Sequence, residues 1–360
     1  MPISDGKLNQ NKIYKIFTNM ILKIYVNGDI IKNTNAELLN DIRESVGLNG
    51  DKIKLRDFDV LPRREWLADA ESVNLTKNYR LQHEKEFDIN IDQYSYFALT
   101  TDSYLSKASF MSDRSFAEFQ AALLNCVKSS KECFESTDYL AFVGTAKGLG
   151  SVKEITVTND GMLAQRLSEG LANLWVELKR PTTKFNGYGY RRSYKDSDIK
   201  VMWNSAFMNS ITSVSLPVLF SAPEGLKAKF SQYVYSPDFF GKMNTITKKT
   251  ADANTRYAVG VTDNIGTENE VVHLAGDPVA AGTVIADASK ILIPTYQVDP
   301  TIACQVLVDN PVPYFDQFEI ANDFANPASL NTTHRIIYAH NTLEIVPSRP
   351  IVTVEVVEKA

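Results

Sequence analysis

Residues 87–148, FDINIDQYSYFALTTDSYLSKASFMSDRSFAEFQAALLNCVKSSKECFESTDYLAFVGTAKG, decide the fold because a strand pattern and a long helix pattern follow each other there. Residues 87–92 alternate strictly between apolar and polar side chains, which predicts a half-buried strand. The alternation continues at Tyr94, Tyr96 and Ala98. This part of the chain is therefore expected to lie in a sheet that has one covered face.

The second half of the stretch predicts a helix over residues 113–135. Ser115 and Glu118 have the spacing of a capping box, in which a hydroxyl and a carboxylate bind the first free backbone N–H groups. Residues 140–143 are apolar and precede a glycine-containing loop, which predicts a short strand. The apolar stripe of the helix has the spacing of one helical face and consists of Phe116, Phe119, Leu123, Cys126, Val127, Ser130 and Phe134.

Outward from this stretch, further segments predict an α+β protein. Leucines from Leu163 to Leu178 predict a second helix that ends at Pro181, and Asn204 is expected to cap a third helix. Thr34 is expected to begin a short helix that ends at Gly47. Strands are predicted at 20–26, 199–203 (alternating), 291–294, 304–309, 335–339, 342–346 and 351–357.

Composition excludes several classes of protein. The chain has 360 residues with 44% hydrophobic and 22% charged side chains, which is ordinary for a globular protein. Its net charge, 38 − 43 = −5, argues against a strongly basic nucleic-acid binder. Three cysteines, Cys126, Cys133 and Cys304, form no CxxC motif, so reduced thiols are expected rather than disulfides or a zinc site. No apolar stretch is long enough to predict a membrane span.

Residues 51–86 are dense in charge, with isolated apolar residues such as Phe58, Trp66 and Leu67 among them. A segment this charged cannot lie inside a core. Exposed Trp and Leu side chains cost about 25 cal/mol per Å² of apolar area left in water. We therefore expect an arm that lies on another chain, and the alternative is a solvated hairpin of a monomer.

Catalytic motifs do not emerge from the sequence. The four histidines form no HExxH pair, no phosphate-binding glycine motif fits, and no cofactor or metal is predicted. Asp57 and Asp59 are interpreted as solvated carboxylates. A hydrolase site assembled from dispersed residues such as His273 and Asp277 remains an alternative.

The loop 184–192 interleaves aromatic and basic residues: Tyr188, Tyr190, Arg191 and Arg192. Such a set can stack nucleic-acid bases and bind phosphates. A loop that packs on a neighbouring subunit explains it equally well.

The order of these segments resembles the major capsid proteins of tailed double-stranded-DNA phages, of the Hong Kong 97 type. That order is a charged extended arm, an alternating strand, a capped long helix, a glycine loop, a second helix, and a strand that ends in Trp-Asn before a short helix. The resemblance is carried by residues 87–148 and by three further stretches. These are MLAQRLSEGLANLWVEL (162–178), IKVMWNSAFMNSI (199–211) and THRIIYAHNTLEIVPSRPIVTVEV (333–356).

The resemblance implies the phage major capsid protein fold and a division of the chain into the parts of that family. The implied parts are an N-terminal arm (1–48), an extended loop with its flanking strand (49–98), a peripheral domain (99–190 and 335–360) with the spine helix at 113–135, and an axial domain (191–334) with a local elaboration at 223–290.

The resemblance also implies a structural protein without catalysis or cofactor. Copies would assemble through hexamers and pentamers into an icosahedral head that encloses double-stranded DNA without binding it tightly. The net negative charge fits this expectation. The long helix begins too early in the sequence to leave room for a built-in scaffolding segment, so a separate scaffolding protein and a portal are expected partners. The expected location is the virion capsid, after assembly in the host cytoplasm and without a membrane.

The residues expected at contacts between subunits lie in the charged arm and in the aromatic and basic loop. They are Phe58, Arg63, Arg64, Trp66, Leu67, Tyr188, Tyr190, Arg191 and Arg192. Three alternatives stay open from the sequence: an encapsulin-like shell that encloses cargo enzymes, the soluble hydrolase, and a nucleic-acid-binding protein that uses residues 184–192.

Overall fold

The computed structural model describes residues 34–45, 52–63, 84–101, 113–149, 152–208, 231–244, 250–285, 294–328 and 331–358. The chain divides into two compact units. Unit 1 consists of Met1–Asn49, Ile91–Ser136 and Phe315–Asn341, and unit 2 of Gly50–Asn90, Thr137–Tyr314 and Thr342–Ala360. Two elements, β3 (Lys85–Thr101) and α4 (Asp113–Gly144), continue along the chain from one unit into the other.

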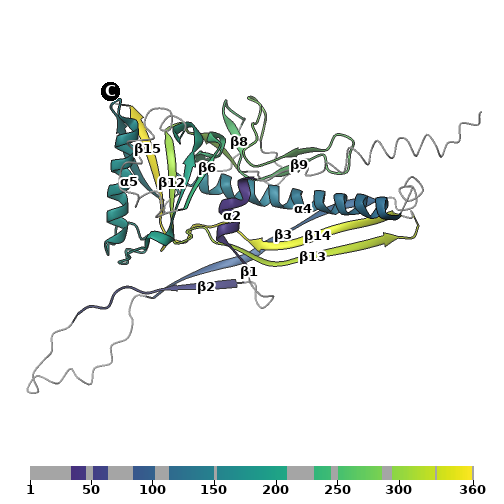
Figure 1. The fold of residues 1–360 in the computed structure, drawn as a ribbon, viewed down its shortest axis with the longest axis horizontal. Helices are drawn as coiled ribbons and strands as arrows, with labels where there is room; N and C mark the ends of the chain where they lie inside the picture. Colours follow the sequence, from purple (N-terminus) through teal and green to yellow (C-terminus); the bar gives the residue numbers. More distant parts are fainter. Residues whose placement is uncertain are drawn as a thin grey trace, which may run out of the picture. The chain divides into compact units, whose positions relative to one another are not determined.

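Unit 1 is an antiparallel sheet with one long helix on its face. The strand order is β1 (Arg43–Ser45), β13 (Tyr314–Asn326), β14 (Asn331–Asn341) and the later part of β3. The helix α4 runs along β13 and β14 (Figure 1), and the rings of Phe97 on β3 and Phe134 on α4 lie 5.4 Å apart. A short 3₁₀ helix, η1 (Thr34–Ala36), and α2 (Glu37–Ile42) precede β1.

Unit 2 is organised by a mixed five-stranded sheet in the order β4-β15-β12-β5-β6. Its strands are β4 (Val152–Asn159), β5 (Ile199–Asn204), β6 (Ser231–Tyr235), β12 (Ile302–Val308) and β15 (Ile351–Glu358). The pairs β15–β4 and β5–β6 are parallel, and β12 is antiparallel to both of its neighbours. The helix α5 (Leu163–Lys179) stands beside this sheet (Figure 1) and buries its leucines in a core shared with β4, β5, β12 and β15.

Smaller elements complete unit 2. Strands β7 (Gly241–Met243), β11 (Thr295–Val298) and β8 (Thr255–Tyr257) form a three-stranded sheet, and β9 (Val261–Asp263) pairs with β10 (Val271–His273). The strand β2 (Lys52–Asp57) pairs with the first six residues of β3. Two 3₁₀ helices, η3 (Asp196–Asp198) and η4 (Pro237–Phe239), precede β5 and β7.

Most of the predicted elements are present. The α+β class, the strand after residue 86, the helix that ends before Pro181, and the strands at β5, β12 and β15 are confirmed. The cap at Asn204 is also confirmed, because its Oδ1 accepts a hydrogen bond of 3.0 Å from the backbone N–H of Ala206. The predicted strands at 20–26 and 291–293 and the side chains of the expected capping box lie outside the described residues.

The prediction of a strand at residues 140–143 is wrong, because α4 continues to Gly144. Leu140, Ala141 and Val143 are fully buried. A short run that is apolar on every side has no period that separates a buried strand from a buried helical turn.

Three boundary predictions are also corrected. The first short helix ends at Ile42 instead of Gly47, because the next three residues join the sheet as β1. Residues 342–346 form no strand; the backbone N–H groups of Thr342 and Val346 bind single carbonyls of Asn90 and Pro311. The strand β5 is buried at all six positions instead of alternating, since it lies inside the sheet between β12 and β6.

A β-bulge explains why the aromatic residues of β3 face outward. In the pairing with β14, Gln93 lies opposite His340 and Ile91 opposite Asn341, so β3 carries one extra residue between them. Beyond the bulge, Phe97 packs toward α4, and Tyr94 and Tyr96 are exposed. The alternation after residue 92 therefore marks the exposed face of the strand.

Unit 1 also contains a buried ion-pair network. The carboxylate of Glu135 lies 2.7 Å from Nη2 of Arg43 and 3.7 Å from Nζ of Lys131. Lys131 is itself buried and also binds Glu319 at 2.6 Å, and Arg43 reaches Asp316 at 3.3 Å. The network joins β1, α4 and β13, and buried charges of this kind depend strongly on their partners.

Removing the shared carboxylate should destabilise the protein strongly. We expect Glu135→Ala to lower the free energy of unfolding by about 3–5 kcal/mol, because Lys131 and Arg43 lose their buried counter-charge. The measurement is urea denaturation. The control, Glu154→Ala at an exposed position on β4, should change stability by less than about 0.5 kcal/mol. Equal losses in both variants would contradict the role of the network.

His340 should make the protein less stable in mild acid. Burial lowers the pKa of its imidazole, against the opposing effects of the Asn341 carbonyl and Asp316. The unfolded chain therefore binds this proton at a higher pH than the folded chain, so stability falls as the pH drops below about 6.5. We expect His340→Gln to lose less melting temperature than the unsubstituted protein between about pH 7.5 and about pH 5.5. Identical losses would count against His340 as the titrating group.

Candidate assembly interface

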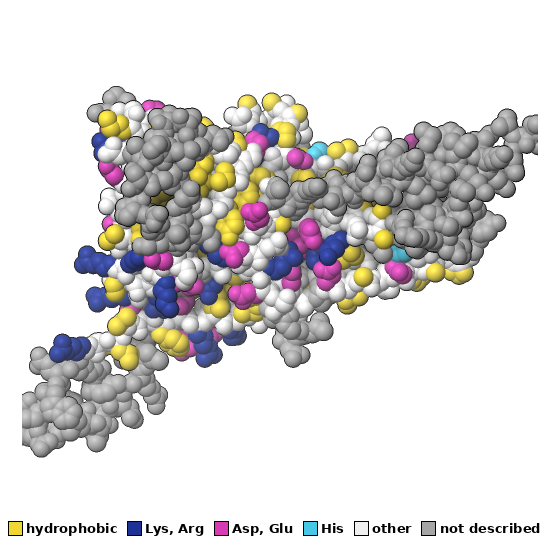
Figure 2. Space-filling model, in the orientation of Figure 1, with side chains coloured by type: hydrophobic (Ala, Val, Ile, Leu, Met, Phe, Trp, Pro, Cys, Tyr) yellow, Lys and Arg dark blue, Asp and Glu magenta, His cyan; other side chains and the backbone are white. Residues whose placement is uncertain are grey.

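The charged arm begins as a two-stranded ribbon in unit 2. Residues Lys52–Asp57 of β2 lie opposite Asn90–Lys85 of β3, in antiparallel order. Lys54 and Arg56 bind Glu86 across the ribbon at 3.3 and 2.8 Å. These side chains are exposed, and charges of both signs mix on the surface over β2 (Figure 2), so each pair contributes little to stability. The ribbon is held mainly by its backbone ladder.

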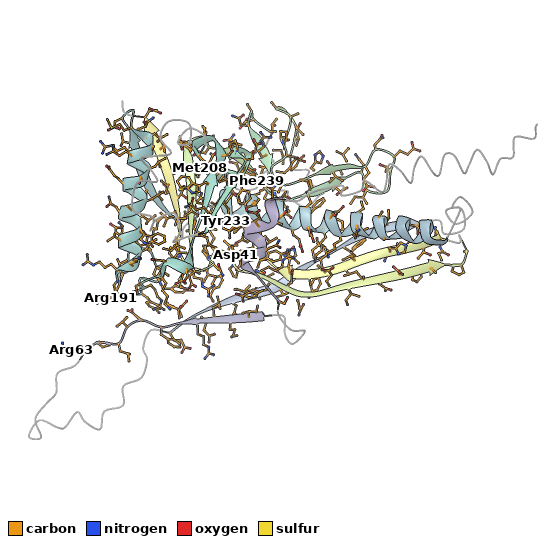
Figure 3. The ribbon with its side chains drawn as sticks, viewed as in Figure 1. Asp41, Arg63, Arg191, Met208, Tyr233 and Phe239 are labelled. Atoms are coloured by element: carbon orange, nitrogen blue, oxygen red, sulfur yellow. The ribbon has the colours of Figure 1, made fainter. Side chains whose placement is uncertain are left out.

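Apolar side chains without cover follow directly after the ribbon. Phe58, Val60 and Leu61 are 39%, 62% and 70% exposed. Arg63 is also exposed and lies further out along the segment (Figure 3). Arg64, Trp66 and Leu67 lie outside the described residues. Several exposed apolar residues in a row indicate a surface that is covered in a larger assembly.

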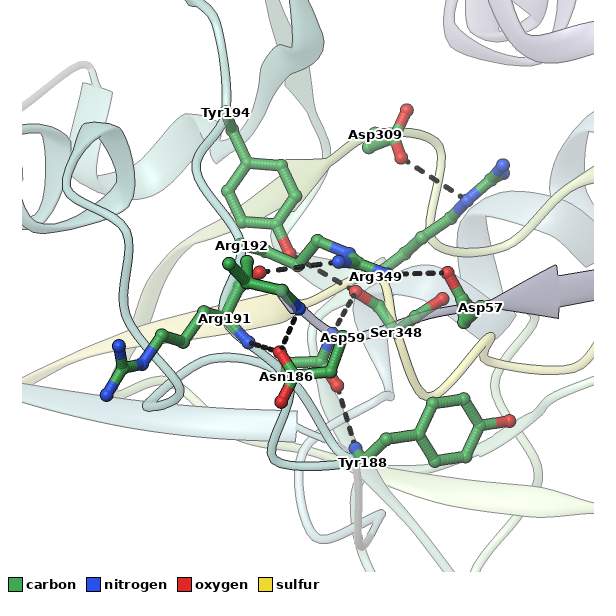
Figure 4. A network of polar contacts seen from close by, with 11 residues as sticks. Asp57, Asp59, Asn186, Tyr188, Arg191, Arg192, Tyr194, Asp309, Ser348 and Arg349 are labelled. Atoms are coloured by element: carbon green, nitrogen blue, oxygen red, sulfur yellow. Dashed lines mark hydrogen bonds and ion pairs between the residues drawn. The ribbon is translucent and has the colours of Figure 1, made fainter. Parts of the chain in front are cut away.

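Two aspartates anchor the end of this ribbon to the aromatic and basic loop of the same chain (Figure 4). Asp57 Oδ1 lies 3.2 Å from Nη2 of Arg192. Asp59 Oδ1 accepts hydrogen bonds from the backbone N–H groups of Arg191, at 3.1 Å, and Val60, at 2.7 Å. These two backbone hydrogen bonds lower the pKa of Asp59, so the carboxylate stays charged in mild acid. We call this set of contacts the arm clamp.

The loop on the other side of the clamp is itself fixed by the segment before β15. Asn186 donates from Nδ2 to the Ser348 carbonyl at 3.4 Å and accepts at Oδ1 from the backbone N–H of Tyr188 at 2.8 Å (Figure 4). A Cβ atom at Gly187 would lie 2.7 Å from the Pro347 carbonyl oxygen, so only glycine allows this close approach. The loop is therefore a rigid support for the base of the arm.

The structure places the predicted contact residues in two groups. Tyr188, Tyr190, Arg191 and Arg192 lie together beside the arm base of their own chain, with the guanidinium of Arg192 6.0 Å from the Tyr190 ring centre. The side chain of Arg191 points away from the clamp, whereas Arg192 turns into it (Figure 4). Phe58 and Arg63 lie on the arm as expected.

Sequence reasoning missed four residues of this region. The interpretation of Asp57 and Asp59 as solvated carboxylates is wrong, because both bind the loop across more than 130 residues of sequence. Val60 and Leu61 were not among the predicted contact residues, although both are exposed. Their apolar type within a charged segment was the available signal.

Other candidate chemistry falls into separate structural roles. His273 lies 3.2 Å from Asp263, and Asp277 accepts a hydrogen bond from the backbone N–H of Leu274 within its own turn. Within the described ranges, no group of three or more His, Cys, Asp or Glu residues is placed to hold a metal ion. No helix in the described part of the chain is long and apolar enough to cross a membrane.

Unit 1 presents a second exposed apolar surface, on the face of its sheet opposite α4. Tyr96 on β3, Ile337 on β14 and Ile320 on β13 are direct neighbours across the strands. Tyr94 and Phe324 extend this face in the two directions, and all but Ile337 are largely exposed. The guanidinium of Arg335 lies over the ring of Tyr96 at 5.7 Å.

Comparison with solved structures identifies the fold. The chain is similar to one in the capsid structure of Staphylococcus phage Andhra, with a TM-score of 0.60 and 12% identity over 88% of this chain and 84% of that chain. It is similar to one in the structure of head fiber and inner core protein gp22 of native bacteriophage P68, with a TM-score of 0.59 and 15% identity over the same shares of the two chains. The chain has the phage major capsid protein fold.

The capsid fold confirms the fold class expected from the sequence, and the likeness at this identity concerns the fold. No protein-family model matches the sequence, and no curated protein matches it significantly. The order of elements therefore carried the resemblance to capsid proteins, since no shared sequence motif was available.

The arm clamp should show measurable coupling in a double-mutant cycle. We expect Asp57→Ala and Arg192→Ala to be coupled by about 1 kcal/mol in urea denaturation, because this ion pair is partly buried. The control cycle on Glu177 and Lys184, an exposed pair at 2.7 Å, should give less than about 0.5 kcal/mol. No coupling in the first cycle would mean that the clamp does not hold the arm.

Proposed function

We propose that this protein is a phage major capsid protein. Copies of it assemble through hexamers and pentamers into an icosahedral head that encloses double-stranded DNA. The role is structural and needs neither catalysis nor a cofactor. The observation that carries the proposal is the similarity of 88% of the chain to a chain of a phage capsid structure.

Exposed apolar surface supports the proposal independently. Phe58, Val60 and Leu61 on the arm base are left uncovered by their own chain. Burying such side chains gains about 25 cal/mol per Å² of apolar area. A subunit that presents them on a rigidly clamped base is suited to contact neighbouring copies through different patches, as ring-forming subunits do.

The proposal extends to the division of the chain and to its partners. Residues 1–48 would form the N-terminal arm, 49–98 the extended loop, 99–190 with 335–360 the peripheral domain, and 191–334 the axial domain. A scaffolding protein and a portal would act during assembly in the host cytoplasm, and the DNA would be held without tight binding. The net charge of −5 favours such loose contact, because each bound phosphate adds salt-dependent affinity.

Particle size tests the proposed function. We expect shells, tubes, or isolated pentamers and hexamers when the purified protein, with and without its scaffolding protein, is observed by negative-stain microscopy and light scattering. A stable monomer or dimer under all these conditions would contradict the proposal. Particles purified with enclosed enzymes instead of DNA would indicate an encapsulin-like shell.

Substitution at the arm base tests which surface drives assembly. We expect Leu61→Ser to raise the protein concentration needed for assembly by about tenfold, which corresponds to about 1.4 kcal/mol of lost apolar contact. The control is Val357→Ser, an exposed apolar position on β15. Folding of both variants is checked by their melting temperatures. Equal effects of the two substitutions would argue against the arm base as a contact surface.

A further inference from the structure

Two segments of unit 2 have opposite and unmixed charge. Residues 179–195 contain no Asp or Glu, and residues 257–285 contain no Lys or Arg. The first segment, which we call the basic surface, carries Lys179, Arg180, Lys184, Arg191, Arg192 and Lys195. The second, which we call the acidic lobe, carries Asp263, Glu268, Glu270 and Asp277.

The acidic lobe presents apolar side chains on both sides of a short hairpin. The strands β9 and β10 share only three residue pairs. Val271 and Val272 are consecutive and therefore point to opposite faces, yet they are 45% and 54% exposed. Ile265, in the turn of the hairpin, is 75% exposed. A two-stranded hairpin with both faces in water is only marginally stable, so this one requires cover.

The acidic charges of the hairpin have no Lys or Arg within the lobe to balance them. Asp263 faces His273, and Glu270 Oε2 accepts a hydrogen bond from the backbone N–H of Gly266 at 3.3 Å. Glu268 is exposed in the turn between the two strands. The lobe therefore offers negative charge next to exposed valine and isoleucine side chains.

The basic surface has the complementary composition. Lys and Arg side chains gather around the C-terminal end of α5 (Figure 2). Lys179 and Lys184 are paired with Asp196 and Glu177, whereas Arg180 is exposed at the end of α5. Val176 is 67% exposed one helical turn before Arg180, so an apolar side chain lies beside the cationic one.

We propose that the acidic lobe of one copy docks on the basic surface of a neighbouring copy. Within unit 2, α5 and β9 lie on opposite sides (Figure 1), so one chain cannot bring its own two surfaces together. The contact joins two different patches, which is the head-to-tail arrangement that closes rings. The valines and Ile265 gain the apolar burial, and the opposite charges set the orientation and speed of encounter. The inference rests on the proposed capsid function and names the partner of the basic surface.

Charge reversal and its reciprocal rescue test this docking. We expect Glu268→Lys and Arg180→Glu each to slow assembly, followed by light scattering at low salt, by about tenfold. The variant that carries both substitutions should assemble at nearly the original rate, because the charges are again opposite. Glu154→Lys changes the net charge by the same amount as Glu268→Lys, and its exposed site on β4 lies outside both surfaces, so its rate should be unchanged. Melting temperatures establish that all variants fold.

The outcomes separate this inference from the proposed function. Shells of the unsubstituted protein whose assembly is indifferent to both reversals, or singly impaired variants that the double substitution does not rescue, would overturn the docking alone. If Arg180→Glu leaves assembly intact but weakens binding to a single-stranded oligonucleotide, the basic surface serves nucleic acid and the docking is wrong. A protein that never assembles contradicts both the docking and the capsid function.

Discussion

The side-chain amide of Gln305 lies in the middle of β12, a strand that is buried at all seven of its positions. A buried amide must find partners, because leaving it unbonded costs more than the bond itself contributes. Its Oε1 accepts a hydrogen bond from Thr353 on β15, and its Nε2 donates to the carbonyl of Gly144 at the end of α4. The core of unit 2 therefore depends on bringing three distant segments to one point.

Local patterns in the sequence predicted the elements but not these meetings. The leucine spacing of α5 and the cap at Asn204 are properties of a few neighbouring residues, and both were predicted correctly. The pairing of Asp57 with Arg192 joins residues 135 positions apart, and a single sequence holds no signal for it. The end of α4 was missed because uniform burial removes the period on which a prediction relies.

The subunit combines rigid supports with uncovered edges. The arm clamp fixes the base of a charged ribbon, and the loop that holds the clamp is itself fixed by Ser348 and Pro347. Around these supports, apolar residues remain exposed in small separate groups on the arm base, on the sheet of unit 1 and on the β9–β10 hairpin. Small patches bordered by charge keep a free chain soluble and still offer several sites for neighbours.

The position of β15 has a consequence for the timing of folding during synthesis. This strand lies between β4 and β12 in the sheet, although it follows both of them by tens of residues in the sequence. While a ribosome is still translating the earlier segments, β4 lacks the strand that it pairs with and one edge of β12 is open. Domains fold as units once their last required strand has emerged. A nascent chain thus acquires the finished surface of unit 2 only late in translation, which delays its recruitment into a growing particle.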